Sequence, residues 1–246
     1  MLKNKNIVIT GATGGIGRAI VNECAKNHAN VWALLRKVDD DTKMWIEALK
    51  IQNNVEIKPV IIDFLDRESI REAASKIIEE NIGIDGIVNN AGVVGNIELF
   101  SMTRMDDIKE TFEINFFGPM EFTQRLLKRL MRQKKGSIVN ISSIASLDGE
   151  PGQFAYVSSK AAINGATKKL SNELAPFNIR VNAIAPGMVD TNMLSNMTEE
   201  LKKDMLNKLA IKRLAKPEEI GKLCTFLLSD NSEFITGQII RIDGGR

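Results

Sequence analysis

Cysteine and histidine are scarce in this chain of 246 residues. It contains two cysteines, Cys24 and Cys224, and one histidine, His28. The cysteines lie far apart in helical patterns and form no CxxC pair, and the single histidine, His28, cannot complete a metal set. The sequence therefore supports neither a disulfide framework nor a metal site, and we expect both cysteines to be small buried apolar residues.

An excess of one charge and a long apolar run are missing as well. The 33 basic residues against 31 acidic residues leave a net charge of +2, so neither nucleic acid nor an anionic membrane is an expected partner. No apolar run reaches the ~20 residues of a transmembrane helix. The first six residues carry no apolar signal region. We expect a cytoplasmic protein.

Short β-branched runs alternate with longer amphipathic stretches along the whole chain. This alternation is typical of βαβ units on a parallel sheet. It predicts an α/β fold, a Rossmann-type doubly wound parallel sheet of about seven strands with helices on both faces. No linker or repeat interrupts it, so we expect a single domain over residues 1–246. The expected strands are Ile7–Thr10, Asn30–Leu35, Val55–Ile62, Gly86–Asn89, Ser137–Ile141, Arg180–Ile184 and Ile239–Ile242, and the expected helices are Gly15–Lys26, Asp41–Ile51, Arg67–Glu80, Met105–Gln133, Gln153–Ala175 and Pro217–Leu228.

One stretch, Met188–Ala210, does not follow this alternation. It follows a strand and is rich in Met, Asn and Lys. Ligands in such sheets bind beyond the carboxyl ends of the strands, so this stretch is a candidate substrate lid. An ordinary pair of surface helices is the alternative.

A glycine-rich turn follows the first expected strand. Residues Thr10–Gly17 read TGATGGIG and open directly into a helix pattern. Glycines there allow a tight turn and let backbone N–H groups and the helix N-terminus approach a pyrophosphate. Many loops use glycine for turn geometry alone. The position between a strand and a helix at the start of the chain indicates a dinucleotide site.

The second expected strand ends without an acidic residue. NAD enzymes usually place Asp or Glu there, about 20 residues beyond the glycines, to bind the ribose hydroxyls. This chain has Leu35, Arg36 and Lys37 instead. The planar guanidinium of Arg36 suits a 2′-phosphate, and Lys37 adds a second positive charge. We therefore expect NADP(H), with a solvated basic pair as the alternative.

Further motifs follow the turn in a fixed order. They are Asp63, the run Asn89-Asn90-Ala91-Gly92, then Asn115, Ser143, Tyr156 and Lys160, and finally Pro186-Gly187 with Thr191. Any one of them could be chance, but the ordered set spans nearly the whole chain. In this set the chain resembles the short-chain dehydrogenase/reductase family.

The resemblance implies a nicotinamide dinucleotide and assigns residues to it. Asp63 would bind the adenine amino group, and Asn90 to Gly92 would line the adenine-side ribose. The segment from Pro186 would frame the nicotinamide. Taken alone, Asn89-Asn90 could simply form a turn and Pro186-Gly187 could simply end a strand. The residues expected at the cofactor are Gly11, Thr13, Gly15, Ile16, Gly17, Arg36, Asp63, Asn90, Ala91, Gly92, Tyr156, Lys160, Pro186, Gly187, Val189 and Thr191.

Tyr156 and Lys160 form the expected chemical centre. Hydride transfer to a ketone leaves an alkoxide, so a proton donor must touch the carbonyl oxygen. Tyr156 is the only tyrosine, and a nearby ammonium can lower a phenol pKa of ~10 by ~1–3 units. The two residues are four apart in one expected helix and share a face. We expect Lys160 to polarise the phenol and to bind the nicotinamide ribose, although Tyr-x-x-x-Lys alone is more often structural.

Ser143 and Asn115 complete the expected catalytic group. Ser143 follows the fifth strand, where its hydroxyl could bond the substrate oxygen. Ser142 is the neighbouring alternative, and the family's spacing to the tyrosine favours Ser143. Asn115 lies beside a Gly-Pro pair that would distort its helix. In the family, an asparagine there holds a water that links the lysine to solvent.

Two other function classes compete with a ketone reductase. A serine hydrolase needs a Gly-x-Ser-x-Gly elbow and a late histidine, but the chain lacks the elbow and His28 precedes the second strand. A dinucleotide-binding regulator would keep the fold without catalysis, and the complete set of catalytic residue types argues against it. NADPH oxidation with a panel of ketones separates an enzyme from a regulator.

Within the family, the C-terminal run 234–245 looks most like 3-oxoacyl-[acyl-carrier-protein] reductases of fatty-acid synthesis. This implies 3-oxoacyl thioester substrates and acyl carrier protein as a partner, with sugars, steroids and small alcohols as alternative substrates. Two positions depart from the pattern. Gly14 stands where a basic residue often holds the 2′-phosphate, and Phe177 where a basic residue often docks the carrier. The other docking position corresponds to Lys134 or Lys135.

Relatives of this kind are usually homotetramers, joined through the two long helices flanking the sheet and through the C-terminal region. The expected helix Met105–Gln133 carries several large apolar residues. They could serve either the sheet or a partner subunit.

Overall fold

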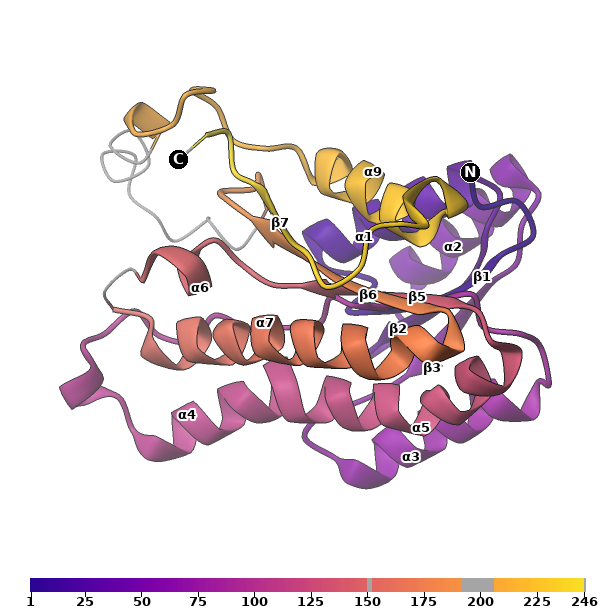
Figure 1. The fold of residues 1–246 in the computed structure, drawn as a ribbon, viewed down its shortest axis with the longest axis horizontal. Helices are drawn as coiled ribbons and strands as arrows, with labels where there is room; N and C mark the ends of the chain where they lie inside the picture. Colours follow the sequence, from indigo (N-terminus) through magenta and orange to yellow (C-terminus); the bar gives the residue numbers. More distant parts are fainter. Residues whose placement is uncertain (150–151, 192–205, 246) are drawn as a thin grey trace.

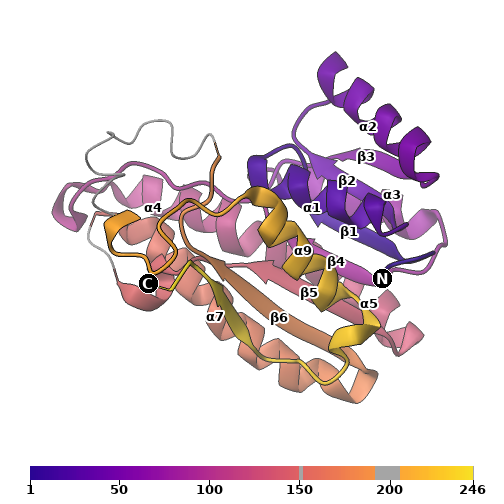
Figure 2. The same ribbon diagram turned by 90° about the horizontal axis from the view of Figure 1, so that it is seen from above.

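One parallel sheet organises the protein. The structure, a computed structural model that describes residues 1–149, 152–191 and 206–245, has a seven-stranded sheet in the order β3-β2-β1-β4-β5-β6-β7 (Figures 1 and 2). Every neighbouring pair of strands is parallel. The chain moves outward from β1 to β3 and then returns to the other side of β1 at β4, so the topological switch point lies between β1 and β4. The predicted fold class is confirmed.

The strands occupy the predicted apolar runs with small shifts at their ends. The second, fourth and seventh strands match their predicted bounds, β3 is shorter than predicted, and β6 extends to Pro186. The strands are β1 Asn6–Thr10, β2 Asn30–Leu35, β3 Ile57–Ile61, β4 Gly86–Asn89, β5 Gly136–Ile141, β6 Ile179–Pro186 and β7 Ile239–Ile242.

Helices cover both faces of the sheet and bury a separate core on each. One face carries α1 Gly15–Lys26, α2 Asp40–Asn53 and α9 Pro217–Leu228, and the other carries α3 Arg67–Glu79, α4 Met105–Phe112, α5 Gly118–Gln133 and α7 Phe154–Leu174 (Figure 1). The first core includes Ile20 and Cys224, and the second is built around Phe122, which is fully buried. The short helix α6, Ala145–Asp148, follows β5 and was not predicted.

The predicted helix Met105–Gln133 is wrong as a single helix. The chain instead forms α4, a π-helical segment at Glu113–Phe117, and α5. Gly118 lies against Phe64 so closely that an added Cβ would sit 2.8 Å from that side chain. Pro119 lacks the N–H that a continuous helix needs and occupies the first turn of α5 instead.

Both cysteines are buried, as predicted, in the layer of α1 and α9. Cys24 and Cys224 have no exposed surface. Burial raises the pKa of the Cys24 thiol to about 12 and that of Cys224 well above its ordinary value. Neither thiol has the environment of a nucleophile.

The greater part of the candidate lid, residues 192–205, lies outside the described residues. Its first residues continue from β6, and Val189 pairs with Ala215 in an isolated bridge. Among the described residues, no helix is long and apolar enough to span a bilayer.

Candidate active site

The turn after β1 is fixed to the turn after β4. Gly11 adopts φ +64°, a left-handed conformation that suits glycine. The Asn90 side chain donates to the carbonyl oxygens of Thr10 and Gly11, both at 3.1 Å. The Thr10 hydroxyl accepts from the backbone N–H groups of Asn90 and Ala91, both at 3.0 Å. Asn90 therefore shapes the glycine turn from the neighbouring strand.

The N-terminus of α1 has the features of an anion site. An added Cβ at Gly17 would lie 2.0 Å from the Gly11 oxygen, so only glycine lets the helix begin this close to the turn. The N-cap residue Gly14 provides no side-chain cap, and the first turn holds no acidic residue. The first N–H groups of the helix lack intrahelical acceptors. This is the arrangement that a dinucleotide pyrophosphate requires.

The same turn lies against the segment that follows β6. An added Cβ at Gly15 would sit 2.5 Å from the Cγ2 of Thr191. The Thr191 hydroxyl donates to the Val189 carbonyl at 3.4 Å. Gly187 donates its N–H to Ile242 at 3.0 Å, which ties the segment to β7. Residues predicted at the two ends of the cofactor are thus brought to one edge of the sheet.

Two basic side chains stand at the end of β2. Arg36 and Lys37 are both exposed, and within the described parts of the chain neither makes a hydrogen bond or an ion pair. Asp63 is exposed after β3, and its Oδ1 accepts from the N–H of Leu65 at 2.9 Å. The guanidinium of Arg36 is therefore available to an anionic ligand.

Lys160 is buried beneath the catalytic group. Its side chain is almost completely inaccessible, with 3% of the residue exposed, and its Nζ donates to the Ile141 carbonyl at 2.8 Å. Burial lowers its pKa to about 8. The Nζ lies 5.8 Å from the centroid of the Tyr156 ring. An added Cβ at Gly92 would be 3.2 Å from both this Nζ and the Oδ1 of Asn115.

The Ser143 side chain lies close enough to the Tyr156 hydroxyl to influence its pKa. Burial raises the pKa of Tyr156, and Ser143 partly opposes the shift. The phenol therefore stays protonated at neutral pH, which differs from the expectation that Lys160 would lower its pKa. The reason is geometric, because the Lys160 ammonium is directed at the Ile141 carbonyl.

Ser142 has a different environment from Ser143. It is buried, and its hydroxyl bonds to the Lys160 carbonyl at 3.3 Å and to Ser146 at 3.2 Å. Ser143 is the serine that influences the pKa of Tyr156. The structure thus favours Ser143 over its neighbour as the group beside the phenol.

Asn115 occupies the π-helical segment and is 1% exposed. It exchanges two hydrogen bonds with the backbone of Val93, accepting at 2.7 Å and donating at 2.9 Å. Its Nδ2 also donates to Ser159 at 3.0 Å. Both amide hydrogens are thus used within the protein, and the side chain fixes the segment after β4 to the helix that carries Tyr156.

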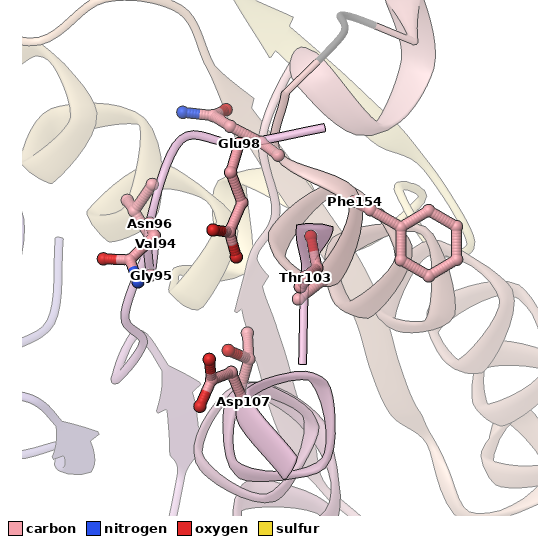
Figure 3. A pocket seen from close by; sticks show the side chains of 10 residues that line it. Val94, Gly95, Asn96, Glu98, Thr103, Asp107 and Phe154 are labelled. Carbon is pink, nitrogen blue, oxygen red and sulfur yellow. The ribbon is translucent and has the colours of Figure 1, made fainter. Parts of the chain in front are cut away.

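A pocket beside the catalytic group was not predicted from the sequence. It lies between the segment after β4, α4 and the start of α7, and its walls include Glu98 and Asp107 (Figure 3). These residues come from separate elements and form no motif. Only the three-dimensional arrangement reveals them.

The expected carrier-docking positions do not flank the catalytic group within this chain. Lys134 and Lys135 precede β5, whereas Ser143 follows it, so they lie at opposite edges of the sheet. Phe177 precedes β6 and packs against the core on the α5 and α7 face. The carrier-docking positions expected from the resemblance therefore lie away from Ser143 within one chain. His28 also lies at this far edge, before β2, which removes it as a base for a hydrolase.

Comparisons with known proteins agree with this geometry. A sequence profile of the family described as Enoyl-(Acyl carrier protein) reductase matches residues 11–246. The 3-oxoacyl-[acyl-carrier-protein] reductases of Thermotoga maritima and Aquifex aeolicus are 37% and 36% identical over 244 residues, covering 99% of this chain and 98% of each relative.

Solved structures show the same fold over the whole chain. A 3-oxoacyl-[acyl-carrier protein] reductase from Brucella melitensis has a TM-score of 0.91 at 30% identity, covering 99% of this chain and 91% of its own. An NAD+-bound xylitol dehydrogenase has a TM-score of 0.89 at 27% identity and 99% coverage of both chains. The chain therefore belongs to the short-chain dehydrogenase/reductase family of nicotinamide-dependent oxidoreductases.

Proposed function

We propose that this protein reduces 3-oxoacyl thioesters with NADPH. The observation that carries the proposal is the grouping of Ser143, Tyr156 and the buried Lys160, whose Nζ lies 5.8 Å from the centroid of the Tyr156 ring, at the edge of the sheet that holds the glycine turn. The names of the most similar relatives support the substrate class. The acyl carrier protein or CoA would carry the thioester.

The chain's own residues supply proton transfer and orientation. NADPH, bound along the glycine turn, would supply the hydride. Tyr156 is protonated at neutral pH and would donate its proton to the alkoxide oxygen as it forms. Ser143 would donate a hydrogen bond to the same oxygen. Lys160 keeps its charge below about pH 8, and its Nζ, held by the Ile141 carbonyl, would bind the nicotinamide ribose.

Replacement of Tyr156 by Phe tests the proton donor. Tyr156→Phe should lower kcat by ~10²–10⁴-fold, the range for loss of a general acid, while leaving the Kd for NADPH nearly unchanged. Fluorescence titration and steady-state rates on the same preparation provide both values. Near-normal turnover would remove Tyr156 from the mechanism, and NADPH binding without turnover in the wild type would support a regulator.

The preference for NADPH depends on Arg36. Because the xylitol dehydrogenase of the same fold was solved with NAD+, the fold alone does not select the cofactor. A charge-assisted contact with the 2′-phosphate is worth ~1.5–3 kcal/mol, which is on the order of 10–100-fold in selectivity for NADPH over NADH. Gly14 has no side chain that could make a second such contact. We expect kcat/KM to favour NADPH by the lower half of this range and Arg36→Ala to abolish the preference. Equal values in the wild type would reject the assignment.

The family description raises enoyl reduction as a second candidate. Hydride adds to carbon in both reactions, but the proton ends on oxygen when a ketone is reduced and on C2 when an enoyl thioester is reduced. The hydroxyl of Tyr156 with Ser143 beside it suits delivery of a proton to a carbonyl oxygen. Acetoacetyl-CoA and crotonyl-CoA offer the two groups on one carrier. Turnover of crotonyl-CoA alone would replace our proposal with enoyl reduction.

A further inference from the structure

A small acidic pocket adjoins the catalytic group and has no role in the reaction described above. We call it the Glu98 pocket, and its polar walls are Asn96, Glu98, Thr103, Asp107, Thr111 and Gln153 (Figure 3). The carboxylates of Glu98 and Asp107 point into the same space, whereas the ring of Phe154 points away from it.

The two carboxylates lack a counter-charge. Glu98 and Asp107 are each partly buried, and none of the residues that line the pocket is basic. In the part of the chain that the structure describes, neither carboxylate makes a side-chain hydrogen bond or an ion pair. Partly buried carboxylates without partners are unfavourable, so the pocket is suited to a ligand that donates hydrogen bonds.

Thr111 gives an independent indication of a ligand. It is only 5% exposed, and its hydroxyl has no hydrogen-bond partner among the described residues. The hydroxyl lies 3.6 Å from the position of an added Cβ on Gly95, which also lines the pocket. Its Oγ1 is not among the fully buried atoms that lack a partner, so the hydroxyl faces the open space of the pocket, where water or a ligand can bond to it.

The pocket is connected to the catalytic residues by the chain itself. Gln153 and Ala155 line it and immediately precede Tyr156. The N–H of Glu98 donates to the Gly152 carbonyl at 2.8 Å, which holds the segment after β4 against the start of α7. Val94 follows Val93, the partner of Asn115. The pocket is therefore lined by the segments that carry Tyr156 and that bond to Asn115.

The size of the pocket limits its occupant. The cavity measures about 20 Å³, and roughly 10–15 Å³ accommodates one water molecule. It can thus receive a single N–H or O–H group, but an acyl chain or a ring is too large.

We propose that the Glu98 pocket is a specificity subsite that accepts a hydrogen-bond-donating group of the substrate, an N–H or O–H. This inference rests on the proposed function and deepens it, because the arm that carries thioesters on CoA or carrier protein contains amide N–H groups. Glu98 and Asp107 accept the hydrogen bonds. The same carboxylates repel substrates with a free carboxylate at that position.

Matched ketones that differ by one N–H test the subsite. The first pair is N-methylacetoacetamide and N,N-dimethylacetoacetamide, and the second is acetoacetyl-N-acetylcysteamine and its N-methylated amide. The measured quantity is the ratio of kcat/KM within each pair. The variants are Glu98→Ala and Asp107→Ala, with Asp106→Asn as the control, because Asp106 is an exposed acid on the same helix that pairs with Lys109 at 3.4 Å.

We expect Glu98→Ala and Asp107→Ala each to reduce the within-pair ratio by about 10-fold, as for loss of a charge-assisted hydrogen bond. The change should appear mainly in KM, and Asp106→Asn should leave the ratio unchanged. A ratio that neither alanine variant alters in either pair would overturn the inference, as would a lack of turnover with all four ketones. If the thioesters are inert while the amide pair responds to the variants, the proposed function fails and the subsite stands.

Discussion

Replacement of Lys160 by Met should stabilise the protein and inactivate it. The ammonium of Lys160 is buried and has no carboxylate partner among the described residues, and burial lowers its pKa from 10.5 to about 8. At ~1.36 kcal/mol per pKa unit, this shift corresponds to about 3 kcal/mol of destabilisation at neutral pH. Loss of the hydrogen bond to Ile141 would offset ~1–3 kcal/mol of the stability gained by removing the charge. A net gain of about 1 kcal/mol is therefore expected at pH 7.

The pH dependence of this difference is the stronger test. Below about pH 8 Lys160 is charged in both the folded and the unfolded chain, so the destabilisation is fully present. As the pH rises from about 8 towards 10.5, the folded protein loses the proton first, and the destabilisation disappears. The advantage of Lys160→Met should thus fall by ~2 kcal/mol between pH 7 and pH 10.

Urea unfolding measures both the stability difference at pH 7 and its change with pH. The cofactor is left out because a bound ligand would add its own stabilisation. Lys168→Met is the matched control, since Lys168 is exposed on the same helix, and its effect should not vary with pH. A difference between Lys160→Met and the wild type that stays constant from pH 7 to pH 10 would refute the claim that the charge of Lys160 is costly.

Two further predictions concern packing. Gly17→Ala should lower the free energy of unfolding by ~2–5 kcal/mol, because the new Cβ meets the Gly11 oxygen. Gly165→Ala is the control and should be neutral or stabilising, because nothing lies within 4 Å of its added Cβ. Equal urea midpoints for the two variants would contradict this prediction. Cys24 and Cys224 should resist thiol reagents in the folded protein and react only as denaturant unfolds it, and rapid labelling of the native protein would show that the layer of α1 and α9 opens more readily than its burial indicates.

The sequence was most informative where local geometry and chemistry coincide. The bounds of α1 were predicted because the glycine turn and the amphipathic pattern of Gly15–Lys26 specify the same element. Tyr156 and Lys160 share a helix face because their spacing requires it. Asn90 was predicted from its motif, but its hydrogen bonds to the turn after β1 depend on the adjacency of β1 and β4.

The sequence was least informative where distant residues meet. A π-helical segment at Asn115 leaves no periodic signal of its own, because it adds only a local change in hydrogen bonding. The direction of the Lys160 ammonium, towards Ile141, follows from packing. Glu98 and Asp107 belong to two elements whose approach is decided by the fold.

The π-helical segment fixes the angular phase between α4 and α5. Deleting one residue from Glu113–Phe117 would allow ordinary helical hydrogen bonding to continue, and it would also rotate α4 by about 100° relative to α5. Asn115 would then turn away from Val93, and Thr111 would leave the wall of the Glu98 pocket. A one-residue deletion in this segment would thus remove both the bonds of Asn115 to Val93 and the Thr111 wall of the Glu98 pocket, while every strand of the sheet would stay in register.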